Sequence, residues 1–209
     1  SIKKQETWKS SNTAFGAWRS ALESSGILVF QSDRVSLSEM RGYSIADFPL
    51  PIISVNNKDA PAGRIFSMLH ELVHIMLRAS GICDMDFRLK WASPEQRVEV
   101  FCNHVAGAAL IPKPILLNDQ IVKSHKGDEW EDQELSQLSK KYAVSREVVL
   151  RRLLTFGRTN EYFYQNKRRL FQEEIKKIKM DIPIPYSVRV LSRIGQPFAR
   201  LVLNAHNAE

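Results

Sequence analysis

Long apolar segments and paired cysteines are both scarce in this sequence. No apolar run approaches the roughly 20 residues that cross a bilayer, and no signal pattern precedes the first polar stretch, so a membrane protein is excluded and a cytoplasmic one is expected. Only two cysteines, Cys83 and Cys102, occur in 209 residues, too few for a disulfide framework and without the CxxC spacing of a thiolate zinc site. We expect both to be reduced thiols, with Cys102 as a small core residue.

Internal repeats, low-complexity tracts and long Gly/Ser linkers are also missing, which predicts one substantial core, alone or with a small appended domain. The hydrophobic fraction of 44% and the charged fraction of 25% are ordinary for a globular protein. The net charge of +7 is uneven, because residues 131–209 hold 15 of the 30 Lys and Arg but only 9 of the 23 Asp and Glu. This basic excess is typical of a nucleic-acid-binding surface and equally of a solvated helical face.

Helix and strand signals alternate in the first half of the chain, and the second half is almost wholly helical in its pattern. The predicted elements are a helix over 13–25, a buried strand over 26–31, a weaker strand over 35–45, a strand over 49–57, a loop over 58–63, a helix from about Arg64, and a helix from Pro94 to just before Pro112.

The helix from about Arg64 carries polar residues that an ordinary core helix avoids. In RIFSMLHELVHIML, residues 64–77, apolar side chains recur at three- and four-residue spacing, yet the stretch contains His70, Glu71 and His74. Residues four apart share a helix face, so the two imidazoles can bind one metal ion, with Glu71 beside the metal's water as a general base. The motif therefore predicts a zinc centre, although two surface histidines would have the same spacing.

A catalytic zinc has three protein ligands and one open position, so a third ligand is expected downstream. In EQRVEVFCNHVAGAAL, residues 95–110, Glu99 lies mid-helix on an otherwise apolar face, where a carboxylate needs a partner such as a metal ion. Asn103 shares that face with Cys102 and is a candidate to hydrogen-bond His70, the alternative being a core asparagine that caps backbone groups. The remaining polar candidates are expected in solvent: Glu95, His104, His125 and His206.

Together these two stretches resemble the ImmA/IrrE family of zinc metallopeptidases, in which HExxH is followed by Glu-x-x-x-Asn and a small-residue run ending in Leu-x-Pro. The similarity covers residues 13–114 well and the helical remainder more loosely. The resemblance implies that His70, His74 and Glu99 bind Zn²⁺ and that Glu71 is the catalytic base. It also implies a bacterial or phage metalloendopeptidase whose protein substrate is a helix-turn-helix transcriptional repressor.

The predicted fold is α+β: a minimal zincin-like peptidase domain, with a small sheet beside the HExxH helix and the third-ligand helix, followed by a mostly helical C-terminal part. We divide the chain into the peptidase domain at 1–127, a helix-turn-helix-like segment at 128–165 and a C-terminal helical region at 166–209. Family members often carry an N-terminal helix-turn-helix domain that this sequence lacks, so we expect it to be a piece of a longer protein.

The helix-turn-helix-like segment has two interpretations. In QELSQLSKKYAVSREVVLRRLLTFG, residues 133–157, one helix is predicted to end at Tyr142, Ser145 caps the next, and Gly157 closes it. The arginines of the second helix either face DNA or are solvated while the helix pair packs on the peptidase core. These arginines are Arg146, Arg151 and Arg152.

Two functions are compatible with these patterns. The first is a zinc-dependent endopeptidase in which Glu71 removes a proton from water and returns it to the leaving amine. The second is a non-catalytic regulator whose basic C-terminal half binds DNA or a partner protein. The presence of Glu71 favours the enzyme, since a protein that only binds has no need of that carboxylate.

Overall fold

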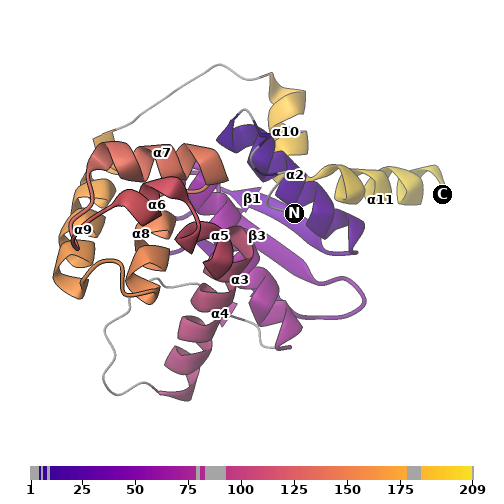
Figure 1. Cartoon of the computed structure of the whole chain (residues 1–209). Helices are drawn as coiled ribbons and strands as arrows, with labels where there is room; N and C mark the ends of the chain where they lie inside the picture. The colour runs from indigo at the N-terminus through magenta and orange to yellow at the C-terminus, as the bar shows by residue number, and fades with distance from the viewer. Residues whose placement is uncertain are drawn as a thin grey trace.

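The computed structural model describes residues 5, 7, 8, 10–78, 81–82, 93–177 and 185–208, and it confirms the predicted α+β class (Figure 1). In chain order the elements are α2 (Ser11–Ser24), β1 (Leu28–Ser32), β2 (Gly42–Ile45), β3 (Ile52–Asn56), α3 (Pro61–Met76), β4 (Gly81–Ile82), α4 (Pro94–Leu110), α5 (Lys113–Leu117), α6 (Gln120–Ser124), α7 (Asp132–Tyr142), α8 (Arg146–Thr155), α9 (Glu161–Lys177), α10 (Tyr186–Ile194) and α11 (Gln196–Asn207). Within these residues, no helix is both long enough and apolar enough to cross a membrane.

The four strands form one sheet in the order β1-β3-β2-β4. β1 runs parallel to β3, with Leu28 opposite Ile52, whereas β2 is antiparallel to both β3 and β4. Of the weaker strand predicted over 35–45, only the last four residues pair with a neighbour. The preceding residues form a turn instead, because the Ser36 carbonyl accepts hydrogen bonds from the amides of Glu39 and Met40.

Helix α3 lies at the centre of the fold, packed against α2, α4, β2 and β3 (Figure 1). It begins three residues before the predicted start, because Pro61 occupies the first helical position, where its missing N–H costs nothing. The prediction of a loop is therefore wrong for residues 61–63. Gly63 is required in this first turn, since a Cβ there would lie 2.5 Å from both carboxylate oxygens of Asp59.

The apolar stripe of α3 is buried except in the last turn. Ile65, Met68 and Val73 are no more than 5% exposed, on a helix that packs against α2, α4, β2 and β3. Met76 is 72% exposed and Leu77 is 45% exposed, so the apolar stripe predicted from the spacing is exposed at the C-terminal end of α3.

Helix α4 begins and ends as predicted. Ser93 is its N-cap, and a capping box joins Ser93 to Gln96, with Pro94 at the first helical position. The helix packs against α3 on one side and α8 on the other. This packing brings a face of α4 onto the polar residues of α3.

The helix pair α7 and α8 also forms as predicted. α7 ends at Tyr142, Ala143 takes a left-handed conformation with φ 52°, and the Ser145 hydroxyl accepts a hydrogen bond from the Val148 amide at 3.1 Å. The domain boundary proposed at 127/128 falls between α6 and α7, whereas the one proposed at 165/166 falls inside the continuous helix α9. The division into domains stays a prediction.

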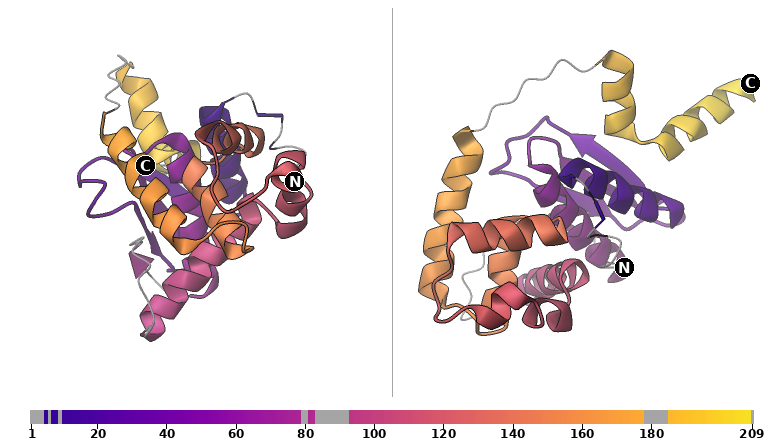
Figure 2. Two further views of the ribbon diagram at one scale, coloured as in Figure 1. Left: turned by 60° about the vertical axis from the view of Figure 1, so that its left-hand side comes forward. Right: turned by 45° about the horizontal axis from the view of Figure 1, so that its top comes forward.

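Helix α10 packs back on the first strand, and α11 follows it (Figure 2). The Ser192 carbonyl of α10 accepts hydrogen bonds from the side chains of Gln31 at 2.7 Å and Arg19 at 2.6 Å. Arg19 also donates to the Val29 carbonyl of β1. At the turn between α10 and α11, Gly195 has φ 82°, and a Cβ there would lie 3.3 Å from that same carbonyl.

Asp119 is the polar link between α6 and α7. Its carboxylate caps α6 through the Ile121 amide at 2.9 Å and accepts hydrogen bonds from Lys141 at 2.8 Å and the Tyr142 hydroxyl at 2.6 Å. Burial alone would raise the pKa of Asp119, but the hydrogen bonds from Lys141 and Tyr142 hold it below its usual range.

Replacing Asp119 by asparagine will lower the free energy of unfolding at pH 7 by about 1–3 kcal/mol, because two donors lose a charged acceptor. A depressed pKa stabilises the fold above the unfolded-state pKa of about 3.9 and loses that effect as the pH falls below it. Urea unfolding should therefore show a difference in the free energy of unfolding between wild type and variant, and this difference should become smaller below about pH 4. The exposed Asp47→Asn is the control, and a difference independent of pH would contradict this role of the charge.

Candidate metal centre

Three ionisable side chains of α3 are enclosed in the core. His70 and Glu71 are fully buried, and His74 is 2% exposed. The i, i+4 spacing places the two imidazoles on one face, with their Nε2 atoms 3.1 Å apart. Two nitrogens at this distance in the interior need a hydrogen bond or a metal ion between them, because two facing lone pairs would repel each other.

Glu99 on α4 completes a triangle with the two histidines. Its Oε2 lies 3.1 Å from His70 Nε2, and its Oε1 lies 2.9 Å from His74 Nε2. Zinc bonds of about 2.0–2.2 Å at tetrahedral angles place neighbouring ligand atoms about 3.3–3.6 Å apart, a few tenths of an ångström more than the three separations observed here. Two nitrogens and a carboxylate fit zinc and leave one tetrahedral position open.

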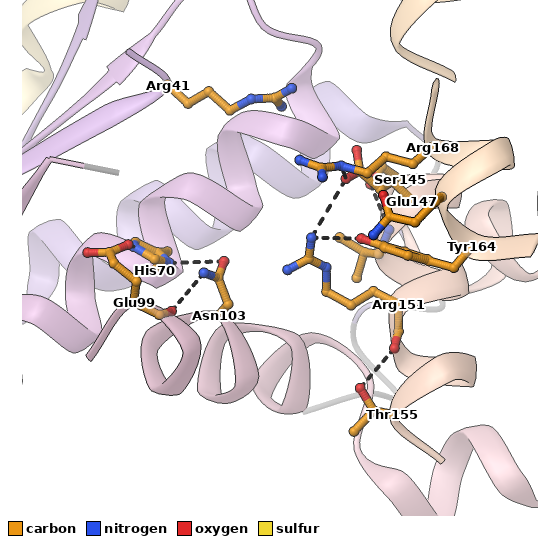
Figure 3. A network of polar contacts seen from close by, with 12 residues as sticks. Arg41, His70, Glu99, Asn103, Ser145, Glu147, Arg151, Thr155, Tyr164 and Arg168 are labelled. Atoms are coloured by element: carbon orange, nitrogen blue, oxygen red, sulfur yellow. Dashed lines mark hydrogen bonds and ion pairs between the residues drawn. The ribbon is translucent and has the colours of Figure 1, made fainter. Parts of the chain in front are cut away.

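Asn103, one turn after Glu99, fixes the orientation of His70 (Figure 3). Its Nδ2 donates to the Glu99 carbonyl at 2.7 Å, so its Oδ1 is the atom that faces His70 Nδ1 at 3.2 Å. An amide oxygen only accepts, so His70 Nδ1 carries a proton. In the neutral imidazole this leaves the lone pair on Nε2, the atom directed at the triangle.

Glu71 lies beside the triangle and under strand β2. Ser44 donates its hydroxyl proton to Glu71 Oε2 at 2.7 Å, while Oε1 is buried without a hydrogen-bond partner among the described residues. Burial raises the pKa of Glu71 to about 7, and the Ser44 hydrogen bond offsets only part of that rise. β2 passes close to Glu71 at Gly42, which has no side chain. A Cβ at this position would lie 3.4 Å from Glu71 Cγ and 3.1 Å from the Ser54 carbonyl.

The electrostatics of the cluster favour a bound cation. Hydrogen bonds to Cys102 and Glu99 raise the pKa of His74 to about 10. Burial would raise the pKa of Glu99, but the adjacent imidazoles of His70 and His74 lower it to about 2. Without a metal ion, the cluster therefore keeps a proton on imidazole beside an ionised carboxylate, in the place where a cation fits.

Sequence reasoning did not assign Cys102 and Ser44 to this site. Cys102 is fully buried, as predicted, but its sulfur also lies within 4.8 Å of ligand atoms of His70 and His74, which makes it an alternative third ligand. The sequence could have indicated this role for Cys102, because a residue three positions after Glu99 lies on the same helix face. No comparable indication exists in the sequence for Ser44, because 27 residues separate it from Glu71 and the pattern of its strand was weak.

The other polar candidates lie apart from the triangle. Glu95, His104 and His206 are exposed, as predicted. His125 is not: its side chain is 8% exposed, stacks on Trp130 with 3.8 Å between ring centroids, and meets Glu134 at 2.9 Å. Cys83 lies outside the described residues.

The arginines of α8 do not form a DNA-facing row. Arg152 is 2% exposed, Arg146 pairs with Glu174, and Arg151 meets the Tyr164 hydroxyl at 2.8 Å. Thr155 alone within α8 is exposed, so this helix does not offer the solvent-facing surface of a recognition helix. A DNA contact through the other basic helices stays a prediction.

Comparison with known proteins identifies a family that covers this part of the chain. The family model Peptidase_M78, described as the IrrE N-terminal-like domain, matches residues 22–154, more than half of the chain. The matched range contains both histidines, Glu71 and Glu99, and it extends into the last turn of α8. No curated protein matches the chain significantly.

Proposed function

Because the chain belongs to the IrrE N-terminal-like peptidase family, we propose that this peptidase is a zinc-dependent endopeptidase that cleaves a protein substrate. The substrate implied by the resemblance is a helix-turn-helix transcriptional repressor, which would make the enzyme a regulatory protease. The observation that carries the proposal is the convergence of His70, His74 and Glu99 beside the buried carboxylate of Glu71.

In this proposal His70, His74 and Glu99 hold Zn²⁺. Support comes from the separations of 2.9–3.1 Å among their ligand atoms and from the Asn103 amide that turns His70 Nε2 toward the others. When bound, zinc lowers the pKa of a water molecule to about 7 and polarises a peptide carbonyl.

Glu71 is the proposed general base. Its Oε1 has no hydrogen-bond partner among the described residues and is the atom available to take a proton from water, while Ser44 holds Oε2. Burial raises the pKa of Glu71 to about 7, which suits a group that accepts a proton and then gives it to the leaving amine.

The position of β2 suggests how an extended substrate binds. Ser44, which holds Glu71, pairs with Gly81 of β4, the strand at the edge of the sheet. A peptide that adds to this edge as a further strand would run along the side of the sheet nearest Glu71. The alternative, a regulator that only binds, leaves the buried cluster and Glu71 without a role.

Elemental analysis of the purified protein tests the proposal. We expect one zinc ion per chain, removed by a chelator with a fall in melting temperature and restored by equimolar zinc. Hydrolysis of a quenched-fluorescent peptide library should disappear and return in step with the metal. A folded chain that contains no zinc and takes none up would overturn the proposal.

A further inference from the structure

A pocket of about 250 Å³ lies between the first turn of α3 and the start of α8, and Phe171 of α9 forms one of its walls. In Figure 3, Arg41, the residue before β2, extends toward Ser145 and Glu147 at the start of α8. None of the residues proposed to bind zinc lines the pocket. Its volume is slightly below the usual range for small-molecule sites, which is about 300–1,000 Å³, so the pocket suits a small ligand.

Two of the lining arginines reach the pocket from its two sides. Arg41, beside the first turn of α3, donates through Nη1 to Asp59 at 3.2 Å. Arg146, the first residue of α8, pairs with Glu174 and stacks on Phe171, with its guanidinium carbon 4.4 Å from the ring centre. Asp59 and Phe171 both line the pocket, so each guanidinium group lies at the pocket wall.

Both guanidinium groups have accessible nitrogens without a partner. The Arg41 side chain is 16% exposed and the Arg146 side chain is 29% exposed. Nε and Nη2 of Arg41, and Nε and Nη1 of Arg146, form no hydrogen bond with the described residues and still have solvent-accessible surface. A guanidinium presents five N–H donors in a planar fork that matches a carboxylate. These two arginines therefore offer free donors to a ligand in the pocket.

The two carboxylates in the lining are already paired with cations. Asp59 is 4% exposed and pairs with Arg41. Glu147 pairs with Arg168 at 3.1 Å and with Arg151 at 3.8 Å. Because the lining holds three arginines and two carboxylates, it has one positive charge in excess, 3 − 2 = +1. The pocket therefore favours a ligand with a single negative charge.

The remaining wall of the pocket is apolar. Phe66, Val144, Val148 and Phe171 line it, and each is at most 5% exposed. Apolar ligand surface gains free energy when it leaves water for such a wall, while a few polar groups fix the orientation of the ligand. The combination of an apolar wall and two guanidinium groups matches an apolar molecule that carries one carboxylate.

We propose that this pocket binds a small organic acid, with its carboxylate between Arg41 and Arg146 and its apolar body along Phe66 and Phe171. Charge-assisted hydrogen bonds from guanidinium to carboxylate are among the strongest that proteins form. The site does not depend on the peptidase activity, because it shares no residue with the triangle or with Glu71.

Thermal unfolding of the full chain, at verified zinc content, tests the site with three probes. Sodium phenylacetate has both a ring and a charge, phenylacetamide has the ring alone, and sodium acetate has the charge alone; sodium chloride at matched ionic strength is the reference. At about 100 times its dissociation constant, phenylacetate should raise the melting temperature by roughly 5–10 °C, with saturation. Phenylacetamide should give no saturable shift, and acetate should bind at least about tenfold more weakly, because it lacks the apolar body.

Arg146→Met should weaken phenylacetate binding by about 10–100-fold, because it removes a charged donor. Arg169→Met, which removes an exposed arginine outside the pocket, should retain wild-type binding, and phenylacetate bound at the zinc ion would affect both variants equally. If Arg146→Met does not fold, Ala62→Phe decides, since Ala62 lines the pocket and a phenylalanine there fills it.

Four results would each overturn the proposal. These are no saturable shift with phenylacetate in the wild type, an equal response to acetate or to phenylacetamide, a shift that persists unchanged in the folded pocket variants, and a loss of binding in Arg169→Met.

Discussion

Glu71→Gln will lower kcat/KM for peptide hydrolysis by about 10²–10⁴, the usual contribution of a positioned general base. Glutamine has nearly the shape of glutamate, so Ser44 keeps an oxygen acceptor and the packing under β2 is retained. The amide cannot take a proton from water, and the loss should therefore appear in kcat. The measurement is cleavage of the quenched-fluorescent peptide library by protein whose zinc content has been verified.

Glu95→Gln is the matched control, because Glu95 is exposed in the first turn of α4, one turn before Glu99. It should retain wild-type kcat/KM within about threefold, as expected of a surface position. A Glu71→Gln enzyme that binds zinc and also retains wild-type kcat would remove Glu71 from the mechanism.

Glu99→Ala will weaken zinc binding by more than about 100-fold, since loss of an outer hydrogen-bond partner of a ligand already costs 10–100-fold. The fold should survive, because the contact from Asn103 goes to the Glu99 backbone carbonyl and does not need the carboxylate. Competition with a chromophoric chelator gives the zinc affinity of each variant, and Glu95→Ala is the control on the same helix.

Cys102→Ala separates the two ligand sets that the geometry allows. If Glu99 is the third ligand, this variant should bind zinc within about threefold of wild type, because the thiol then contributes packing and a hydrogen bond to His74 but no bond to the metal. Retention of zinc by Glu99→Ala together with its loss from Cys102→Ala would assign the site to His70, His74 and Cys102.

The main helices, and the residues that share a face of each helix, could be predicted because they depend on sequence patterns within a few residues of one another. Spacing placed His70 and His74 on one face, and Pro94 after Ser93 marked the start of α4, which the capping box confirms. The pairing of Glu99 with both imidazoles was predictable from one physical requirement, that a carboxylate on an apolar face needs a partner.

The predictions that failed depended on contacts between distant segments. Met76 has the spacing of a core residue but is exposed, because no other described element covers the last turn of α3. Arg152 has the pattern of a solvated or DNA-facing arginine, yet Gly107, 45 positions earlier, provides the space in which it is buried. No local pattern in the sequence connects these two residues.

The packing of α10 on β1 also has a consequence for biosynthesis. The contacts of Ser192 with Arg19 and Gln31 join residues 173 and 161 positions apart. A chain made from its N-terminus can therefore assemble the sheet and α3 before α10 has left the ribosome. During that interval Arg19, which donates to the Val29 carbonyl, hinders pairing of β1 with a strand of another nascent chain, as charged residues do at other sheet edges.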